Sequence, residues 1–238
     1  MTTSEKLVKV AENRERIYEK GKQAERNAFW DGVFSGVNWQ QKFTGSTWND
    51  NTFYPNQDIK PIGHANSLFY LVEITDLVGR LKECGVKLDT SGVTQRSDYM
   101  FNYCTKLTTV PYLDLRNANG YDYSLMGNMF SNCYALKTIE GIHLSDDGLQ
   151  NLGAPYSCFN QCTALENVTF YGKIGTSLYF NQSSMLSRTS IENVVSSLSD
   201  TATGQTISFS NTAKTAAFTD EEWAALIATK PNWTFTLV

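Results

Sequence analysis

The side chains best suited to chemistry in this sequence are five cysteines and two histidines. Thiolates and imidazoles hold zinc when several of them converge, and Cys158 and Cys162 are close enough in sequence to supply two ligands. His64 and His143 are not at ligand spacing from that pair. An odd number of cysteines, in a chain that shows no secretory signal peptide, also argues against a disulfide framework. We therefore expect no metal and no other cofactor.

Acid–base catalysis would need two carboxylates, or a carboxylate and a histidine, held close together. Asp146 and Asp147 are the best candidates in the sequence, and Glu140 or His143 could complete a pair. The two aspartates directly precede Gly148, which is typical of a solvated turn. The sequence also lacks the motifs G-x-S-x-G, H-E-x-x-H, the P-loop and G-x-G-x-x-G. We therefore expect a protein that is not an enzyme.

An internal repeat with a 29-residue period organises the middle of the chain. The segments MFNYCTKLTTV, MFSNCYALKTI and CFNQCTALENV align without gaps and share the pattern [MC]-F-x-x-C-x-x-L-x-x-[VI]. A single unit of this size cannot bury its apolar edge, so such units stack into a solenoid in which equivalent residues form ladders. The cysteines then serve as small buried apolar residues. The expected repeat core is Phe101, Cys104, Leu107, Phe130, Cys133, Leu136, Phe159, Cys162 and Leu165.

The residues around this core predict the elements that hold it. Apolar residues alternate after each L-x-x-[VI], as at Leu113 and Leu115, which is the period of a strand. Upstream, Leu68-Phe69 resembles a degenerate unit. Leu77, Leu81 and Cys84 then follow at helical spacing with Gly85 as a C-cap, so we expect a helix that closes the N-terminal end of the stack.

Residues 187–238 should close the other end of the stack. Capping boxes at Thr189–Glu192 and Thr219–Glu222 predict the starts of two helices. Strands are expected at Thr206–Phe209 and at 233–238, after the helix-breaking Pro231. The expected cap is therefore a helix, a strand, a second helix and a final strand. With it, residues 66–186 form the solenoid and its N-terminal cap, in an α+β fold.

The N-terminal part differs in composition from the rest. Charged side chains are concentrated near the start of the chain, and residues 1–30 predict one long helix with a weak heptad pattern. This helix either packs on the body as an amphipathic helix or projects as a short oligomeric stalk. Residues 31–65 are rich in aromatic residues and form either a small β core or an aromatic platform for glycans.

The overall composition excludes several classes of protein. Charged residues are only 18% of the chain and hydrophobic residues are 41%, so the chain is not of the disordered, highly charged type. A net charge of −4 argues against a nucleic-acid binder, which needs a basic face. No segment approaches the ~20 consecutive apolar residues of a membrane span. Charge throughout residues 1–30 also argues against a secretory leader.

The repeats resemble the leucine-rich repeats of bacterial surface proteins of the BspA type, over about residues 95–172. The order of segments along nearly the full chain, from EKLVKVAENRERIYEKGKQAERNAFWDGV to KPNWTFTLV, resembles proteins carried by phages and prophages of Gram-positive bacteria. That resemblance implies a tail, baseplate or fibre component, assembled in the host cytoplasm and located in the virion. It also implies other virion proteins as partners. By analogy with tail fibres, the N-terminal helix would mediate trimer formation.

The expected role is therefore that of a non-enzymatic structural protein that contributes to recognition of the host surface. The alternative is a bacterial cell-surface adhesin with leucine-rich repeats. Tyrosine offers contact area and a hydroxyl at low entropic cost, which suits a polar partner such as a bacterial surface glycan. Tyrosines at variable positions between the ladder residues should point outward and either contact such a ligand, cover the turns or contact neighbouring subunits: Tyr103, Tyr112, Tyr121, Tyr123 and Tyr134.

Overall fold

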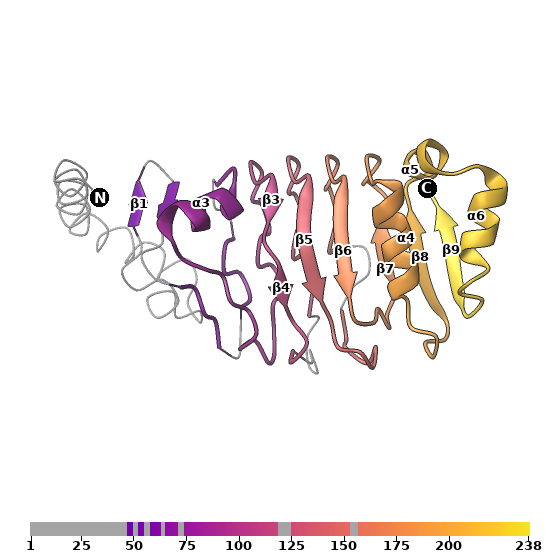
Figure 1. The fold of residues 1–238 in the computed structure, drawn as a ribbon, viewed down its shortest axis with the longest axis horizontal. Helices are drawn as coiled ribbons and strands as arrows, with labels where there is room; N and C mark the ends of the chain where they lie inside the picture. The colour runs from indigo at the N-terminus through magenta and orange to yellow at the C-terminus, as the bar shows by residue number, and fades with distance from the viewer. Residues whose placement is uncertain are drawn as a thin grey trace.

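The computed structural model describes residues 47–49, 52–54, 58–62, 65–70, 74–118, 125–152 and 157–238. The expected long helix over residues 1–30 lies outside these ranges, as do His64, Tyr121 and Tyr123. Within the aromatic-rich region, β1 (Thr47–Asn49) and β2 (Thr52–Tyr54) form an antiparallel pair. The remaining strands follow one another in chain order along the long axis of the molecule, and the last helix lies beyond the last strand (Figure 1).

The first large sheet is parallel and follows the period of the sequence repeat. It contains β3 (Thr109–Val110), β4 (Leu113–Asp114), β5 (Thr138–His143) and β6 (Asn167–Tyr171). β3 and β4 both pair with β5, so they are two halves of one interrupted strand, and β5 pairs with β6. Thr109 lies opposite Thr138, which is the equivalent residue of the next unit. Each strand therefore returns to the same position one repeat later.

A second parallel sheet occupies the C-terminal third of the chain. It consists of β7 (Leu178–Phe180), β8 (Gln205–Phe209) and β9 (Trp233–Leu237), in that order. Leu178 lies opposite Ile207, again one full period later in the chain. The period that sequence alignment finds in three units thus recurs in strand pairing beyond those units.

A stack of phenylalanine rings runs through both parts of the core. Ring centroids of successive members lie 4.5 to 5.7 Å apart, and their planes differ by no more than 22°. All members are almost completely buried, so the stack excludes water along the length of the core. Its members are Phe69, Phe101, Phe130, Phe159, Phe180 and Phe209.

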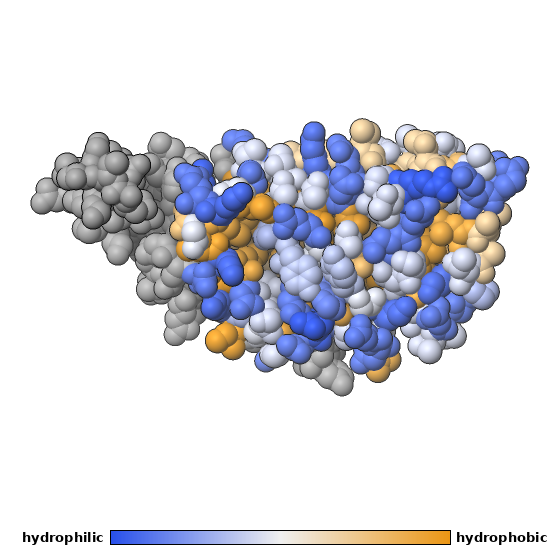
Figure 2. All heavy atoms as spheres, in the orientation of Figure 1, coloured by the Kyte–Doolittle hydropathy of each residue, from blue (hydrophilic) through white to orange (hydrophobic). Residues whose placement is uncertain are grey.

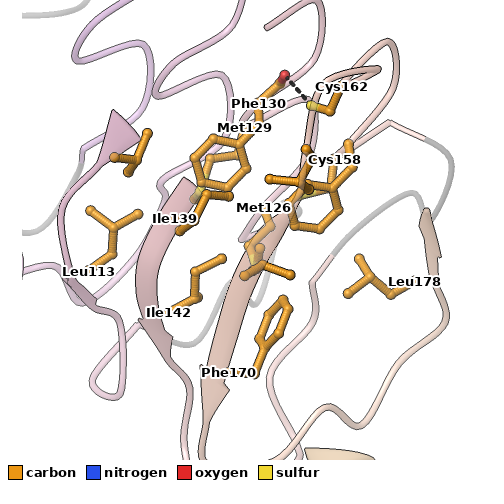
Figure 3. Packing of buried hydrophobic residues seen from close by; sticks show 14 of the residues in the cluster. Leu113, Met126, Met129, Phe130, Ile139, Ile142, Cys158, Cys162, Phe170 and Leu178 are labelled. Atoms are coloured by element: carbon orange, nitrogen blue, oxygen red, sulfur yellow. Dashed lines mark hydrogen bonds between the residues drawn. The ribbon is translucent and has the colours of Figure 1, made fainter. Parts of the chain in front are cut away.

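The cysteines form a second ladder beside the rings. The thiol of Cys133 donates to the carbonyl of Phe101 at 3.0 Å. The thiol of Cys162 donates to the carbonyl of Phe130 at 3.1 Å (Figure 3). Each thiol therefore links its own unit to the preceding one. All nine expected repeat-core residues are buried, with exposed fractions of 1% or less.

Helices flank the ladders, and α3 (Leu77–Cys84) and α4 (Arg188–Ser197) lie next to the two outer strands of the first sheet. As expected, α3 ends at Gly85, which has the left-handed φ of 67°. α6 (Asp220–Ile227) begins with the expected capping box of Thr219 and Glu222. The packing of α6 on the core places Trp223 between the last stacked ring and Phe235.

α4 seals the outer edge of β6 with polar side chains. The Asn193 side chain accepts from the backbone N–H of Phe170 at 2.6 Å and donates to the carbonyl of the same residue at 3.1 Å. Ser190 accepts from the N–H of Val168, and Ser197 donates to the carbonyl of Phe170. These bonds replace the ladder bonds that a further strand would make, so the first sheet ends here.

Two expectations for the C-terminal segment differ from the structure. The first helix is capped by Ser187, whose side chain accepts from Ser190, and not by Thr189. The Glu192 carboxylate instead pairs with Arg188 at 2.8 Å. A further helix, α5 (Asn211–Ala217), follows β8. It has no side-chain hydrogen bond at its N-cap and no clear apolar period, which explains why the sequence does not signal it.

Candidate ligand-binding surface

The structure describes three of the five expected contact tyrosines and separates them into two groups. Tyr112 lies on the first sheet, in the interruption between β3 and β4. Tyr103 and Tyr134 lie in the turns that precede the strands. All three are exposed, with 40 to 45% of their surface accessible. Only Tyr112 joins other aromatic side chains of the sheet, so the sheet carries the best-defined candidate site.

Three rings meet on the first sheet, and we call them the sheet-face triad: Tyr112, His143 and Tyr171. His143 ends β5 and lies opposite Tyr171 of β6. The ring centroids are 6.0 Å apart for Tyr112 and His143, 5.8 Å for the two tyrosines and 5.6 Å for His143 and Tyr171. The planes of each pair are inclined to one another by 46 to 77°. The surface drawn in Figure 2 is mostly hydrophilic or intermediate in character, as expected for a solvent-exposed sheet that still presents rings.

Gly141 lets the two tyrosines close over the sheet. A Cβ atom at this position would lie 2.8 Å from the ring of Tyr112 and 2.8 Å from the ring of Tyr171. Both distances are below normal van der Waals contact, so any larger residue would push the rings apart. The close approach of the two tyrosines therefore depends on the absence of a side chain at Gly141.

Polar groups fix the orientation of the triad. The Tyr112 hydroxyl forms a short hydrogen bond with Nδ1 of His143. Partial burial, and secondarily the Asp114 carboxylate, raise the pKa of Tyr112, so its hydroxyl stays protonated at neutral pH. Which of the two groups donates depends on the imidazole tautomer, because each ring nitrogen can act as a donor or as an acceptor. Among the described residues, Nε2 has no hydrogen-bond partner and is available for a hydrogen bond with a ligand.

An ion pair lies beside the triad. Asp114 is opposite His143 in the sheet, and Arg116 donates to both of its carboxylate oxygens, at 3.0 and 2.7 Å. The hydrogen bonds from Arg116 lower the pKa of Asp114, which keeps the carboxylate ionised. The aspartate therefore neutralises the arginine, so this ion pair adds no net charge beside the triad.

The geometry of the triad favours binding on its outer surface. Rings whose centroids are 5.6 to 6.0 Å apart are in mutual contact, so they leave no space between them for a ligand. This arrangement differs from an aromatic cage that encloses a cation. Its outward ring surfaces, hydroxyls and imidazole nitrogen suit the apolar and hydroxyl faces of a sugar ring.

The residues considered for catalysis and metal binding take other roles. Asp147 accepts from the hydroxyl of Ser145 at 2.6 Å and from the N–H of Leu149 at 2.9 Å, as in a closed turn. Burial raises the pKa of Cys133 to about 12 and raises the pKa of Cys162 well above its usual value, so these thiols are protonated and unreactive. Among the described residues, no cluster of His, Cys, Asp or Glu could hold a metal ion. No helix in the described ranges is long and apolar enough to span a membrane.

Of the three triad residues, the sequence predicts only Tyr112 as a contact residue. His143 received attention only as a catalytic or metal-binding candidate, and Tyr171 received none. A change of register explains why the repeat does not predict Tyr171 as a neighbour of His143. Ile139 lies opposite Val168, one full period later, whereas Ile142 lies opposite Phe170, one position short of a full period. Tyr171 is therefore one position away from where the repeat would place a partner for His143.

Comparison with known proteins gives no relative, because no family model, no curated protein and no solved structure matches the chain.

Proposed function

We propose that this chain is a non-enzymatic component of a phage virion, associated with the tail, baseplate or fibre. In this proposal the stacked units form a short leucine-rich-repeat solenoid that presents the sheet-face triad to a glycan of the bacterial envelope. The virion assignment rests on the resemblance of the segment order to phage and prophage proteins. The binding role is supported by the triad, which is the observation that carries it.

The triad supports a binding role because its parts are positioned before any ligand arrives. Tyr112 is held by His143, and both tyrosines rest over Gly141 on a sheet whose interior is fully packed. Rigid aromatic residues lose little conformational entropy on binding, so more of the contact energy appears as affinity. A surface tyrosine whose only role is to cover a turn would not need such a supporting arrangement.

Binding to bacterial cell walls tests the site. The purified chain should sediment with isolated walls of the bacterium that carries the encoding phage or prophage, and Tyr171→Ala should weaken this binding about tenfold, which corresponds to the loss of one well-packed aromatic contact. Met185→Ala is the control, because Met185 is also exposed (58%) but lies in a turn and belongs to neither strand of the triad. If only the control variant weakened binding, the ligand would not lie on the triad.

The virion assignment has its own test. Mass spectrometry of purified particles should detect the chain, and particles without it should assemble but adsorb poorly to the host. Detection in the bacterial envelope in place of particles would support the adhesin alternative. Failure of the particles to assemble would show an architectural role.

A further inference from the structure

The turns before the strands contain residues with an unusual backbone conformation. Among the described residues, six other than glycine have φ between 52° and 63°, the left-handed region that side chains with a Cβ atom disfavour. They occupy two equivalent positions in the repeat, two residues before and two residues after a phenylalanine of the stack. The first position contains Ser67, Tyr99 and Asn128, and the second contains Tyr103, Asn132 and Gln161.

Neighbouring units fill these positions with different residues. The turn of one unit reads YMFNY from Tyr99 to Tyr103, and that of the next reads NMFSN from Asn128 to Asn132. Asparagine tolerates the left-handed region because its short polar side chain bonds locally, whereas a bulky side chain there is strained. One unit therefore has tyrosine at both strained positions, although the fold accepts asparagine at both in the adjacent unit.

Packing does not account for the two tyrosines. Tyr99 is 40% exposed, and within the described part of the chain its ring contacts no other aromatic ring and its hydroxyl has no hydrogen-bond partner. Tyr103 is 45% exposed and makes one edge-to-face contact with Tyr70, at a centroid distance of 6.2 Å. Backbone strain that is not offset by burial of the side chain is characteristic of residues retained for contact with a partner.

We propose that Tyr99 and Tyr103 form a second contact surface, for an uncharged polysaccharide chain that runs along the axis of the stack. The inference rests on the proposed function, because it takes the bacterial wall as the source of the polysaccharide. It adds a surface separate from the sheet-face triad. Tyr103 lies between Tyr70 of the preceding unit and Asn132 of the next, since its N–H donates to the carbonyl of Ser131.

The spacing of the units favours a polysaccharide over a peptide. Near Tyr103 the stacked phenylalanines are 5.1 and 5.5 Å apart, which measures the rise from one unit to the next. An extended peptide presents side chains on one face about every 6.6 Å, so it would fall out of register with these turns. In a polysaccharide whose pyranose rings are linked through opposite sides of the ring, each sugar lengthens the chain by nearly the spacing between two stacked units. Successive sugars could then meet Tyr70, Tyr103 and Asn132 in turn.

The chemistry of this surface matches an uncharged partner. Its contact groups are aromatic rings, phenolic hydroxyls and side-chain amides, as on Tyr99, Tyr103 and Asn132. The Tyr134 hydroxyl donates to the Asn132 side chain at 3.1 Å, which orients that amide. Because no carboxylate or ammonium is needed for contact, binding should change little with ionic strength.

The test exchanges the strained tyrosines for the residues of the next unit. The double variant Tyr99→Asn, Tyr103→Asn should be more stable than the original chain, with a Tm raised by about 2 to 4 °C, because asparagine relieves the strain. The same variant should bind isolated bacterial walls about tenfold more weakly. A gain in stability together with a loss of binding is the signature of residues kept for function.

Two control variants sharpen the result. Tyr134→Asn makes the same chemical change at a similarly exposed tyrosine without a left-handed φ, so it should not raise the Tm. Lys106→Ala removes an exposed charge close to Tyr103 and should leave wall binding unchanged.

Each remaining outcome overturns the inference in a distinguishable way. If the double variant is not more stable than the original chain, the tyrosines are structural. If it is more stable but binds walls as well as before, or if binding falls steeply with salt, this surface does not bind an uncharged polysaccharide. If the original chain fails to bind walls, the proposed function fails, and this inference fails with it.

Discussion

Ser183 occupies the cysteine position of a further unit, and it provides a direct test of the thiol ladder. The segment FNQSSML from Phe180 repeats the pattern F-x-x-C-x-x-L with serine in place of cysteine. Its backbone bonds match those of the other units: Ser183 donates its N–H to Phe180 at 3.1 Å, as Cys133 does to Phe130. The Ser183 hydroxyl is fully buried and has no hydrogen-bond partner among the described residues.

Replacement of this serine by cysteine should stabilise the protein. A buried hydroxyl without a partner costs about 1–3 kcal/mol, and a new hydrogen bond contributes about 0.5–1.5 kcal/mol. In the equivalent units the thiol reaches the phenylalanine carbonyl of the preceding unit at 2.8 to 3.1 Å. The Phe159 and Phe180 rings are 4.5 Å apart, so this unit is no farther from its neighbour than the others are. We expect Ser183→Cys to gain about 1–2 kcal/mol, or about 2–8 °C in Tm.

Urea unfolding under reducing conditions, followed by circular dichroism, measures this difference at constant m-value. Ser183→Ala is the control, because it removes the unpaired hydroxyl without adding a thiol and should gain less than Ser183→Cys. If the cysteine variant is no more stable than both the original chain and the alanine variant, the thiol–carbonyl ladder does not contribute to stability and the reasoning fails.

Two further predictions concern the core and the response to acid. Leu136→Asp would place an unpaired charge at a fully buried position of the ladder, so it should cost at least about 3–5 kcal/mol and unfold the stack, as a loss of the cooperative thermal transition would show. Hydrogen bonding from Lys230 lowers the pKa of Asp200 below the ordinary 3.8, so the stabilising effect is complete above that value and is lost as the pH falls through the lowered pKa. Tm measured from neutral pH into acid should fall in that range, and Asp200→Asn should flatten the fall.

The stacked units could be predicted from the sequence where the same types of residue recur at a constant spacing. Phe101, Phe130 and Phe159 recur at a constant step with cysteine and leucine at fixed offsets, so alignment finds them. Phe69 could be recognised only as part of a degenerate unit, because its step to Phe101 is longer than the period. Phe180 was missed because its step from Phe159 is shorter and Ser183 replaces the cysteine. Phe209 follows Phe180 by one full period but lacks the cysteine and leucine of the pattern. Ring stacking tolerates such variation, since the connecting loops absorb the difference in length.

The candidate site was harder to anticipate than the fold. Tyr112 could be expected to point outward from its position between ladder residues. Its association with His143 and Tyr171 depends on a change of register within β5 and on the open space above Gly141. Neither feature leaves a periodic signal in the sequence, because a glycine and an irregular strand are common for many other reasons.

The polar seal that α4 places on β6 also bears on how such a protein could change in length over evolution. Ser190, Asn193 and Ser197 bond to backbone atoms, which any strand would offer whatever its side chains. If whole repeat units upstream were duplicated or lost, the last strand of the sheet would still offer the same backbone groups to α4. Recombination could therefore change the length of the stack while the C-terminal segment that begins with α4 stays unchanged.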